Sequence, residues 1–264
     1  MELLGYLASI LIGVSLGLTG SGGAVLTLPL LVYIFHMPPV SAVTYSLFVV
    51  GASSLTGVIP KYRQGLVDVR TAFVFGAPSI TAVILTRKFI VPAIPEILFT
   101  HNRFTITKDI SLMFLFGALM ILAAIYMLRK RRLPTPAAHT YPLPVLLIQG
   151  AITGIVTGLM GAGGGFLIIP ALMLFSNMSV PQAAGTSLLI ITANSLIGFA
   201  AAIPGHAIDW TFLSIISVMA ITGIFIGNYL SRLIAGTKLK TGFGVFILSM
   251  GIYVIIREVT LVTF

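Results

Sequence analysis

Two short stretches of the chain consist largely of glycine and lie between apolar runs. One covers residues 17–24 and is followed by Pro29, and the other covers residues 158–165 and is followed by Pro170. Both fit the pattern G-L-x-G-x-G-G-x-x-L-x-x-P, and they lie 141 residues apart. Glycine at this density breaks a helix and leaves backbone N–H groups without intrahelical acceptors. The two stretches are therefore the first candidates for a binding site.

Free backbone N–H groups in a glycine turn favour an anion as the ligand. Successive N–H groups form a concave nest, and a helix that restarts after the turn directs its positive end at the same point. We therefore expect both clusters to bind the oxygens of one small anion. The alternative is that small residues only allow helices to pack closely, as in G-x-x-x-G contacts. The predicted binding residues are Gly20, Ser21, Gly22, Gly23, Gly161, Gly163, Gly164 and Gly165.

Polar side chains inside the apolar runs provide a second set of candidates. Ser46 and Ser187 share the 141-residue offset, and so do Ser53 and Asn194. Because the members of each half are seven residues apart, each pair lies on one helix face. We predict that Ser46, Ser187 and Asn194 donate hydrogen bonds to the anion. The alternative, a hydrogen bond to the backbone or to another helix, is the more common role of a single serine.

Other kinds of chemistry lack the residues that they require. No set of histidines and carboxylates has metal-ligand spacing, no nucleophile–base pair stands out, and no Lys-Ser/Thr follows either glycine cluster. We therefore predict no enzyme activity, no metal and no cofactor. Asp68 and Asp209 each directly precede an apolar run, which predicts helix N-caps; a role in proton coupling is the alternative.

The composition shows what must position these groups. The chain has 264 residues, of which 58% are hydrophobic and 8% charged, and its mean hydropathy is +1.11. Several apolar runs approach the ~20 residues that cross a bilayer as a helix. Each span must satisfy its own backbone hydrogen bonds, so an all-α polytopic membrane fold is expected. The net charge of +9 is assigned to cytoplasmic loops rather than to nucleic-acid binding.

The order of apolar runs indicates an internal duplication. We predict a first repeat over residues 1–132, a linker over 133–144 and a second repeat over 145–264, with residues 89–109 as a loop. Each repeat contains a hairpin broken by glycine and three further spans. The predicted runs are 3–17, 24–36, 42–60, 70–86 and 110–128, then 145–158, 165–176, 183–203, 210–231 and 241–257.

The basic residues favour opposite orientations of the two repeats. If each glycine hairpin returns to its starting side, the three remaining spans invert the second repeat. The predicted cytoplasmic side then holds ten Lys and Arg residues, and the outer side holds five. The basic turn at residues 61–70 has a repeat equivalent around 203–209 that contains no Lys or Arg. This distribution follows the positive-inside rule and predicts inverted-topology repeats.

The paired glycine clusters resemble those of the TauE/SafE family, the sulfite exporter-like permeases. Residues 184–188, Ala-Gly-Thr-Ser-Leu, and residues 205–210, Gly-His-Ala-Ile-Asp-Trp, add to the resemblance. It implies a multi-pass transporter in the plasma membrane of a bacterium or archaeon, the inner membrane where there are two. The implied substrates are small anions such as sulfite and sulfonates. The first half departs from the pattern at residues 44–46, Thr-Tyr-Ser, so the two halves of the site are not expected to be identical.

The sequence therefore predicts a secondary transporter, an exporter of a small sulfur-containing anion. The anion would be held by the helix breaks near the membrane midplane and moved by alternating access, with a proton or sodium ion as a possible coupling ion. Its partners would be this anion and the lipid bilayer. The alternative function is a membrane scaffold or accessory subunit in which the glycines serve helix packing only.

Overall fold

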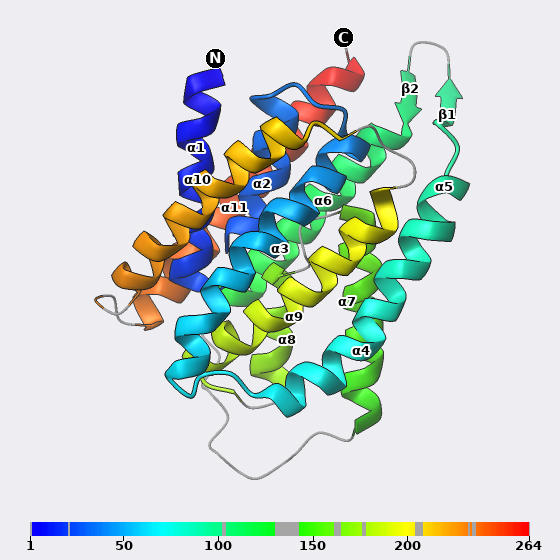
Figure 1. The fold of residues 1–264 in the computed structure, drawn as a ribbon. Coiled ribbons are helices and arrows are strands. Elements are labelled where there is room, and N and C mark those ends of the chain that lie inside the picture. Colours follow the sequence, from blue (N-terminus) through cyan, green and yellow to red (C-terminus); the bar gives the residue numbers. More distant parts are fainter. Residues whose placement is uncertain are drawn as a thin grey trace.

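A computed structural model describes residues 2–20, 22–101, 104–129, 143–160, 165–175, 178–203, 208–231, 233 and 236–263. Within this part of the chain the protein is a helical bundle, as predicted (Figure 1). Seven of its helical segments are long and apolar enough to cross a membrane. The elements in order are α1 (Glu2–Thr19), α2 (Gly22–Tyr33), α3 (Pro39–Arg63), α4 (Val69–Leu85), η1 (Thr86–Ile90), α5 (Val91–Ala93), β1 (Ile97–His101), β2 (Phe104–Thr107), α6 (Lys108–Leu128), α7 (Leu143–Met160), α8 (Gly165–Phe175), α9 (Val180–Ala202), α10 (Trp210–Leu230) and α11 (Gly236–Thr263).

Helices α1 and α2 form the predicted hairpin. Helix α2 has 12 residues and is too short to cross a bilayer as a helix. The ring of Phe35, just beyond α2, packs on Gly5 and lies 5.6 Å from the ring of Tyr6 near the start of α1. The chain therefore returns to the side from which α1 began, as Figure 1 also shows. Helices α7 and α8 contact each other in the second half, and the four residues that join them lie outside the described part.

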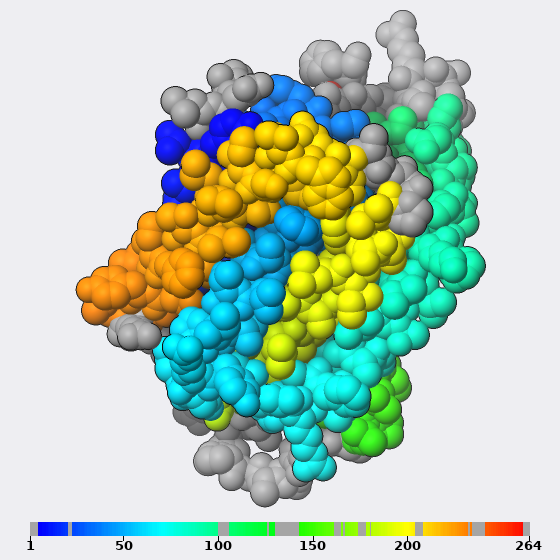
Figure 2. Space-filling model, in the orientation of Figure 1, coloured from blue at the N-terminus to red at the C-terminus, as the bar shows by residue number. Residues whose placement is uncertain are grey.

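Helices α3 and α9 are the most buried of the long helices and cross at the centre of the bundle. Gly51 packs against Leu196, and Gly57, farther along α3, packs near Leu188, which lies earlier in α9. The two helices therefore run antiparallel, and they lie side by side between α10 and α4 in Figure 2. The absence of a side chain at Gly51 permits this close approach, because a Cβ there would lie 2.8 Å from Leu196 Cδ2.

Glycines also join the two halves at the edges of the bundle. Helix α1 packs most extensively against α10, and α7 packs in the same way against α4. In both pairs a Cβ on each glycine would collide with a backbone atom or side chain of the partner helix, and both pairs run parallel. This geometry matches the close helix packing that was the alternative to anion binding, and it includes the first glycine of each cluster. The glycines are Gly13, Gly17, Gly223 and Gly227 in the first pair and Gly150, Gly154 and Gly158 in the second.

The two aspartates cap helices, and the prediction of N-caps is confirmed. The Asp68 carboxylate accepts hydrogen bonds from two N–H groups in the first turn of α4, and Asp209 does the same for α10. The N–H of Asp68 donates to Thr186 Oγ1 (3.0 Å) on α9, and the N–H of Asp209 donates to the Tyr45 hydroxyl (2.6 Å) on α3. Each capped turn is thereby fastened to a helix of the other half.

The prediction of a loop over residues 89–109 is wrong. The helix that contains α4 continues as the π-helix η1 and the short helix α5, and the chain then forms an antiparallel hairpin of β1 and β2. The two basic residues do not end the helix: Lys88 is exposed, with its Nζ 5.7 Å from the centroid of the Phe89 ring, and Arg87 is buried. Pro92 falls in the first turn of α5, where proline is tolerated.

Candidate functional site

Four buried polar side chains lie on α3 and α9, in the stretch where these two helices cross. Ser53 and Ser54 belong to α3, Asn194 and Ser195 belong to α9, and each is 0% exposed. All four lie between the positions at which the two helices touch. These positions are 51 and 57 on α3 and 188 and 196 on α9. The crossing therefore places a polar group inside an apolar bundle.

Most of the polar atoms in this group have no partner. The Asn194 Nδ2 donates a hydrogen bond to Ser79 Oγ on α4 (2.7 Å). The Asn194 Oδ1 and the Oγ atoms of Ser53, Ser54 and Ser195 are buried without a hydrogen bond to any described residue. An unsatisfied buried polar group costs about 1–3 kcal/mol. Several such groups inside a membrane bundle indicate a site that receives a ligand.

The crossing can bind an ion of either sign. Each serine hydroxyl can rotate to donate its proton to an anion oxygen or to turn a lone pair toward a cation, and the amide oxygen of Asn194 is an acceptor. With three hydroxyl donors at hand, an oxyanion would be held by hydrogen bonds alone. The site therefore fits a weakly bound anion, and the lone pairs could also hold a sodium ion.

The two other predicted side chains are engaged with the backbone. Ser46 is buried, and its hydroxyl donates to the carbonyl oxygen of Val43 (2.7 Å). Ser187 donates to the carbonyl oxygens of Ala184 (2.9 Å) and Gly20 (3.1 Å). Ser187 thus connects α9 to the first glycine cluster. Their direct contact with an anion stays a prediction.

Gly20 ends α1 and lies against α9. Its φ of +79° is in the left-handed region, and a Cβ there would lie 2.6 Å from the carbonyl oxygen of Ala184, so only glycine fits without strain. Its own N–H donates to Leu16 (2.7 Å), so this N–H is occupied. Gly22 and Gly23 follow in the first turn of α2, where N–H groups have no acceptor within the helix.

Of the predicted binding residues in the second cluster, only Gly165 is described. Gly165 is buried and begins α8, so its N–H also lies in a first helical turn. Gly161, Gly163 and Gly164, like Ser21 in the first cluster, lie outside the described residues. Anion binding by the two clusters therefore stays a prediction.

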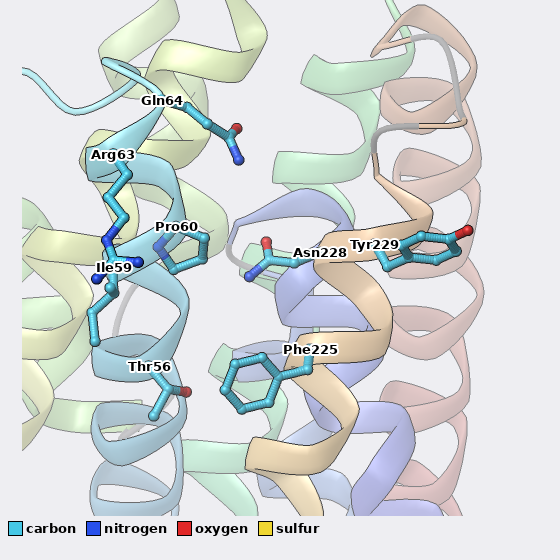
Figure 3. A pocket seen from close by; sticks show the side chains of 8 residues that line it. All are labelled: Thr56, Ile59, Pro60, Arg63, Gln64, Phe225, Asn228 and Tyr229. Carbon is cyan, nitrogen blue, oxygen red and sulfur yellow. The ribbon is translucent and has the colours of Figure 1, made fainter.

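A pocket of about 520 Å³ opens between the ends of α3 and α10 (Figure 3). The amide of Asn228 points from α10 toward α3, and Thr56 faces Phe225 across the pocket. The backbone N of Asn228 lies 2.6 Å from the position that a Cβ of Gly17 would take, so the pocket adjoins the first glycine cluster. Its lining consists of Thr56, Ile59, Pro60, Arg63, Gln64, Phe225, Asn228 and Tyr229.

Some polar groups of this region were not selected from the sequence. Ser79 was overlooked although a small polar residue within the predicted run 70–86 is a usable signal. The predicted run 70–86 ends just before Arg87, which places Arg87 at a span boundary, yet only 6% of it is exposed. The signal for Arg87 is the 141-residue offset, which pairs it with Asn228, a polar residue within another predicted span.

Residues 5–254 match the model of the family described as sulfite exporter TauE/SafE. The chain belongs to this family. A probable membrane transporter protein of Xylella fastidiosa (strain 9a5c) is 32% identical over 255 residues, which cover 94% of this chain and 92% of the relative. The probable membrane transporter protein YdhB of Bacillus subtilis is 27% identical over 236 residues, covering 89% and 92%.

No solved structure matches the chain. The family and the names of the relatives, together with the seven membrane-capable segments, identify a multi-pass protein of the cell membrane and of a transporter family. The prediction of the TauE/SafE family from the two glycine clusters is confirmed.

Proposed function

We propose that this TauE/SafE protein is a secondary transporter that exports a small sulfur-containing oxyanion, such as sulfite or an organosulfonate. The observation that supports it most strongly is the group of unpartnered hydroxyls at the α3–α9 crossing, from Ser53, Ser54 and Ser195. Sulfite and sulfonates present three oxygens that accept hydrogen bonds, so each hydroxyl has an acceptor when the anion is bound. The family description, sulfite exporter, supports the choice of a sulfur oxyanion.

Binding by neutral donors suits a transporter because the substrate must also leave. A hydrogen bond between a neutral donor and a charged acceptor contributes about 1.5–3 kcal/mol, so a few such bonds retain an anion without trapping it. The first-turn N–H groups of α2 and α8 would add donors from the two glycine clusters. A proton or a sodium ion would be the coupling ion.

We further propose that the halves are inverted repeats, which gives alternating access a structural basis. Antiparallel α3 and α9 support this arrangement, because equivalent helices that pair across an axis in the membrane plane must run in opposite directions. The recurrence of the same glycine contacts 141 residues apart, at Gly57 and Gly198 for example, supports the equivalence of the two halves. The excess of basic residues on one side supports the orientation.

A scaffold that uses its glycines only for packing is the competing function. The tight glycine contacts between α1 and α10 and between α7 and α4 favour it. It offers no role, however, for the unpartnered polar atoms at the α3–α9 crossing, because packing alone would be satisfied by alanine at those positions.

The test is ligand-dependent thermal stability of the detergent-purified protein. Sulfite, sulfate, thiosulfate, methanesulfonate, taurine, acetate and phosphate would be compared at equal ionic strength. A ligand that binds only the folded state raises its stability by RT ln(1 + [L]/Kd). A selective rise with a sulfur oxyanion that is lost in a Ser53→Ala/Ser195→Ala double variant is expected. The matched control is Ser249→Ala, which removes an exposed hydroxyl from α11. A flat response to every anion contradicts the proposal.

A further inference from the structure

Arg87 is a buried cation, and two of its three guanidinium nitrogens have no partner in the described part of the chain. It lies in the π-helix η1, which contacts both α7 and α9. Only 6% of the residue is exposed, and its Nε and Nη2 have no hydrogen-bond partner among the described residues. Arginine is almost never buried unless it is paired, because an unpaired buried charge is costly. A partner that is absent from the protein itself would account for the conformation.

Thr86 brings a third unpartnered donor to the same place. Its Oγ1 is buried and has no hydrogen bond. Its Cβ and Cγ2 lie 2.6 and 2.8 Å from the position that a Cβ of Gly158 would occupy. Since Gly158 begins the second glycine cluster, Thr86 and Arg87 stand beside the point where α7 approaches that cluster. A single π-helical turn inside an α-helix is frequently found at a functional site.

The geometry of the free guanidinium edge indicates which ligand it would bind. The N–H of Nε and one N–H of Nη2 point in the same direction and form a fork that matches two oxygens of one oxyanion. A hydroxyl on the preceding residue can donate to a third oxygen. This donor set fits sulfite or a sulfonate better than a spherical ion such as chloride, which cannot accept from both arms of the fork in line.

The neighbouring Lys88 is an example of a basic residue that extends to the surface. Lys88 is exposed and its ammonium lies over the ring of Phe89. A cation that only marks the end of a span extends to the surface in this way. Arg87 instead keeps its guanidinium inside the bundle, between helices that carry the proposed site.

The position equivalent to Arg87 in the second half also has buried polar atoms without partners, but it carries no charge. Asn228 occupies the position equivalent to Arg87, and its Nδ2 and Oδ1 are likewise buried and unpartnered. Gly227 replaces Thr86, so the second half lacks the hydroxyl. Both halves thus keep a ligand-accepting position beside a glycine cluster, and only the first half gives it a positive charge.

We infer that Arg87 binds the transported oxyanion through its Nε–Nη2 edge, with Thr86 Oγ1 as a third donor, at a subsite beside the second glycine cluster. This inference rests on the proposed function. The subsite attracts the anion by charge, and the neutral crossing of α3 and α9 holds it weakly. The single charge makes the transport path chemically asymmetric although its helices are arranged alike.

The test compares Arg87→Gln with Lys88→Gln, an adjacent variant that removes the same charge from the surface. The affinities of the purified proteins for sodium sulfite and sodium methanesulfonate are obtained from thermal-stability titrations at constant ionic strength. The Lys88→Gln variant is expected to bind as the wild type does, whereas Arg87→Gln loses affinity at least tenfold. Without an anion, Arg87→Gln is expected to melt no lower than the wild type, because it removes an unpaired buried charge.

Arg87→Lys keeps the positive charge but lacks the paired N–H groups of the guanidinium. It provides a second test in case the glutamine variant misfolds. It is expected to fold, to bind methanesulfonate more weakly than the wild type, and to lose most of the preference for methanesulfonate over chloride. Wild-type affinity and preference in Arg87→Gln or Arg87→Lys would overturn the Arg87 subsite and leave the proposed function standing. A wild-type protein that binds neither anion would overturn the proposed function itself.

Discussion

The α3–α9 crossing and the region around η1 differ in how far the two halves of the molecule agree. At the crossing, Ser53 and Ser54 of α3 correspond to Asn194 and Ser195 of α9, and all four carry an unpartnered oxygen. Around η1, Arg87 has only a neutral amide as its equivalent. The comparison indicates that the equivalent positions agree at the centre, where their side chains are neutral, and differ at Arg87 and Asn228, where only Arg87 carries a charge.

A single charge has a clear physical advantage. At 4 Å, two opposite unit charges attract by about 4 kcal/mol at the effective dielectric constant near a protein surface. One such interaction raises the local concentration of the anion, and two facing interactions would slow its departure. The departures between the halves that the sequence shows lie elsewhere, at residues 44–46, and Arg87 and Asn228 add a difference in charge to them.

The largest effect is expected from a substitution at the α3–α9 crossing. Asn194→Leu removes both the donor to Ser79 and the free Oδ1 from the crossing. We expect sulfite flux into proteoliposomes to fall by two orders of magnitude or more, about 3 kcal/mol in transition-state terms. Thr222→Val, an exposed change on α10, is the control. Flux within threefold of the wild type would contradict a role for the crossing.

The next variant removes the difference in charge between Arg87 and its equivalent, Asn228. Asn228→Arg places a guanidinium at the position equivalent to Arg87, in the 520 Å³ pocket that Arg63 also lines. We expect the KM for sulfite to fall and the maximal rate to fall by about tenfold, since 1.4 kcal/mol of additional affinity slows release by that factor. Flux measured as a function of sulfite concentration separates the two parameters. An unchanged maximal rate would show that release from this side does not limit transport.

A smaller effect is expected where the crossing meets the first glycine cluster. Ser187→Ala removes the hydroxyl that donates to the Gly20 carbonyl. The loss of one hydrogen bond is expected to lower stability by about 1 kcal/mol, or roughly 2–4 °C in Tm for a chain of this size. The equivalent change, Ser46→Ala, should give a similar shift in detergent melts. A much larger effect of one variant would mean that the two hydroxyls serve different purposes.

The smallest effects are expected from the helix caps. Asp68→Ala and Asp209→Ala each remove a side-chain cap and should lower stability by about 0.5–2 kcal/mol, to a similar extent in both halves. Because both carboxylates are engaged with N–H groups, we expect the pH dependence of sulfite flux to remain unchanged. A shifted pH profile in either variant would instead favour proton coupling through that aspartate.

The sequence predicts the helices well because their signals are local. Long apolar runs give the spans, the glycine cluster gives the end of α1, and an aspartate directly before a run gives a cap. The sequence predicts a loop over residues 89–109 because the prolines and basic residues there obscure a short helix and a hairpin that depend on neighbouring packing.

The candidate site is harder to predict because it depends on which polar groups remain unpaired. The sequence identifies Asn194 as a polar residue within a span. It does not show that the Ser187 hydroxyl is already engaged in a hydrogen bond to the Gly20 carbonyl. Arg87 was missed because a basic residue at the end of an apolar run normally marks a boundary. It is buried within the π-helical turn Thr86–Ile90, for which the residues give no regular signal.

The close pairing of α1 with α10 has a consequence for how the protein is made. Helix α10 follows α1 by about 200 residues, so at ordinary rates of synthesis α1 enters the membrane roughly 10–40 s before its partner exists. During that interval the glycine face around Gly13 and Gly17 must be covered by lipid or by the insertion machinery. Helix α7 meets α4 without such a delay, because α4 is already in place. Assembly on the ribosome therefore finishes the second half's contact with α4 before it can complete the first half's contact with α10.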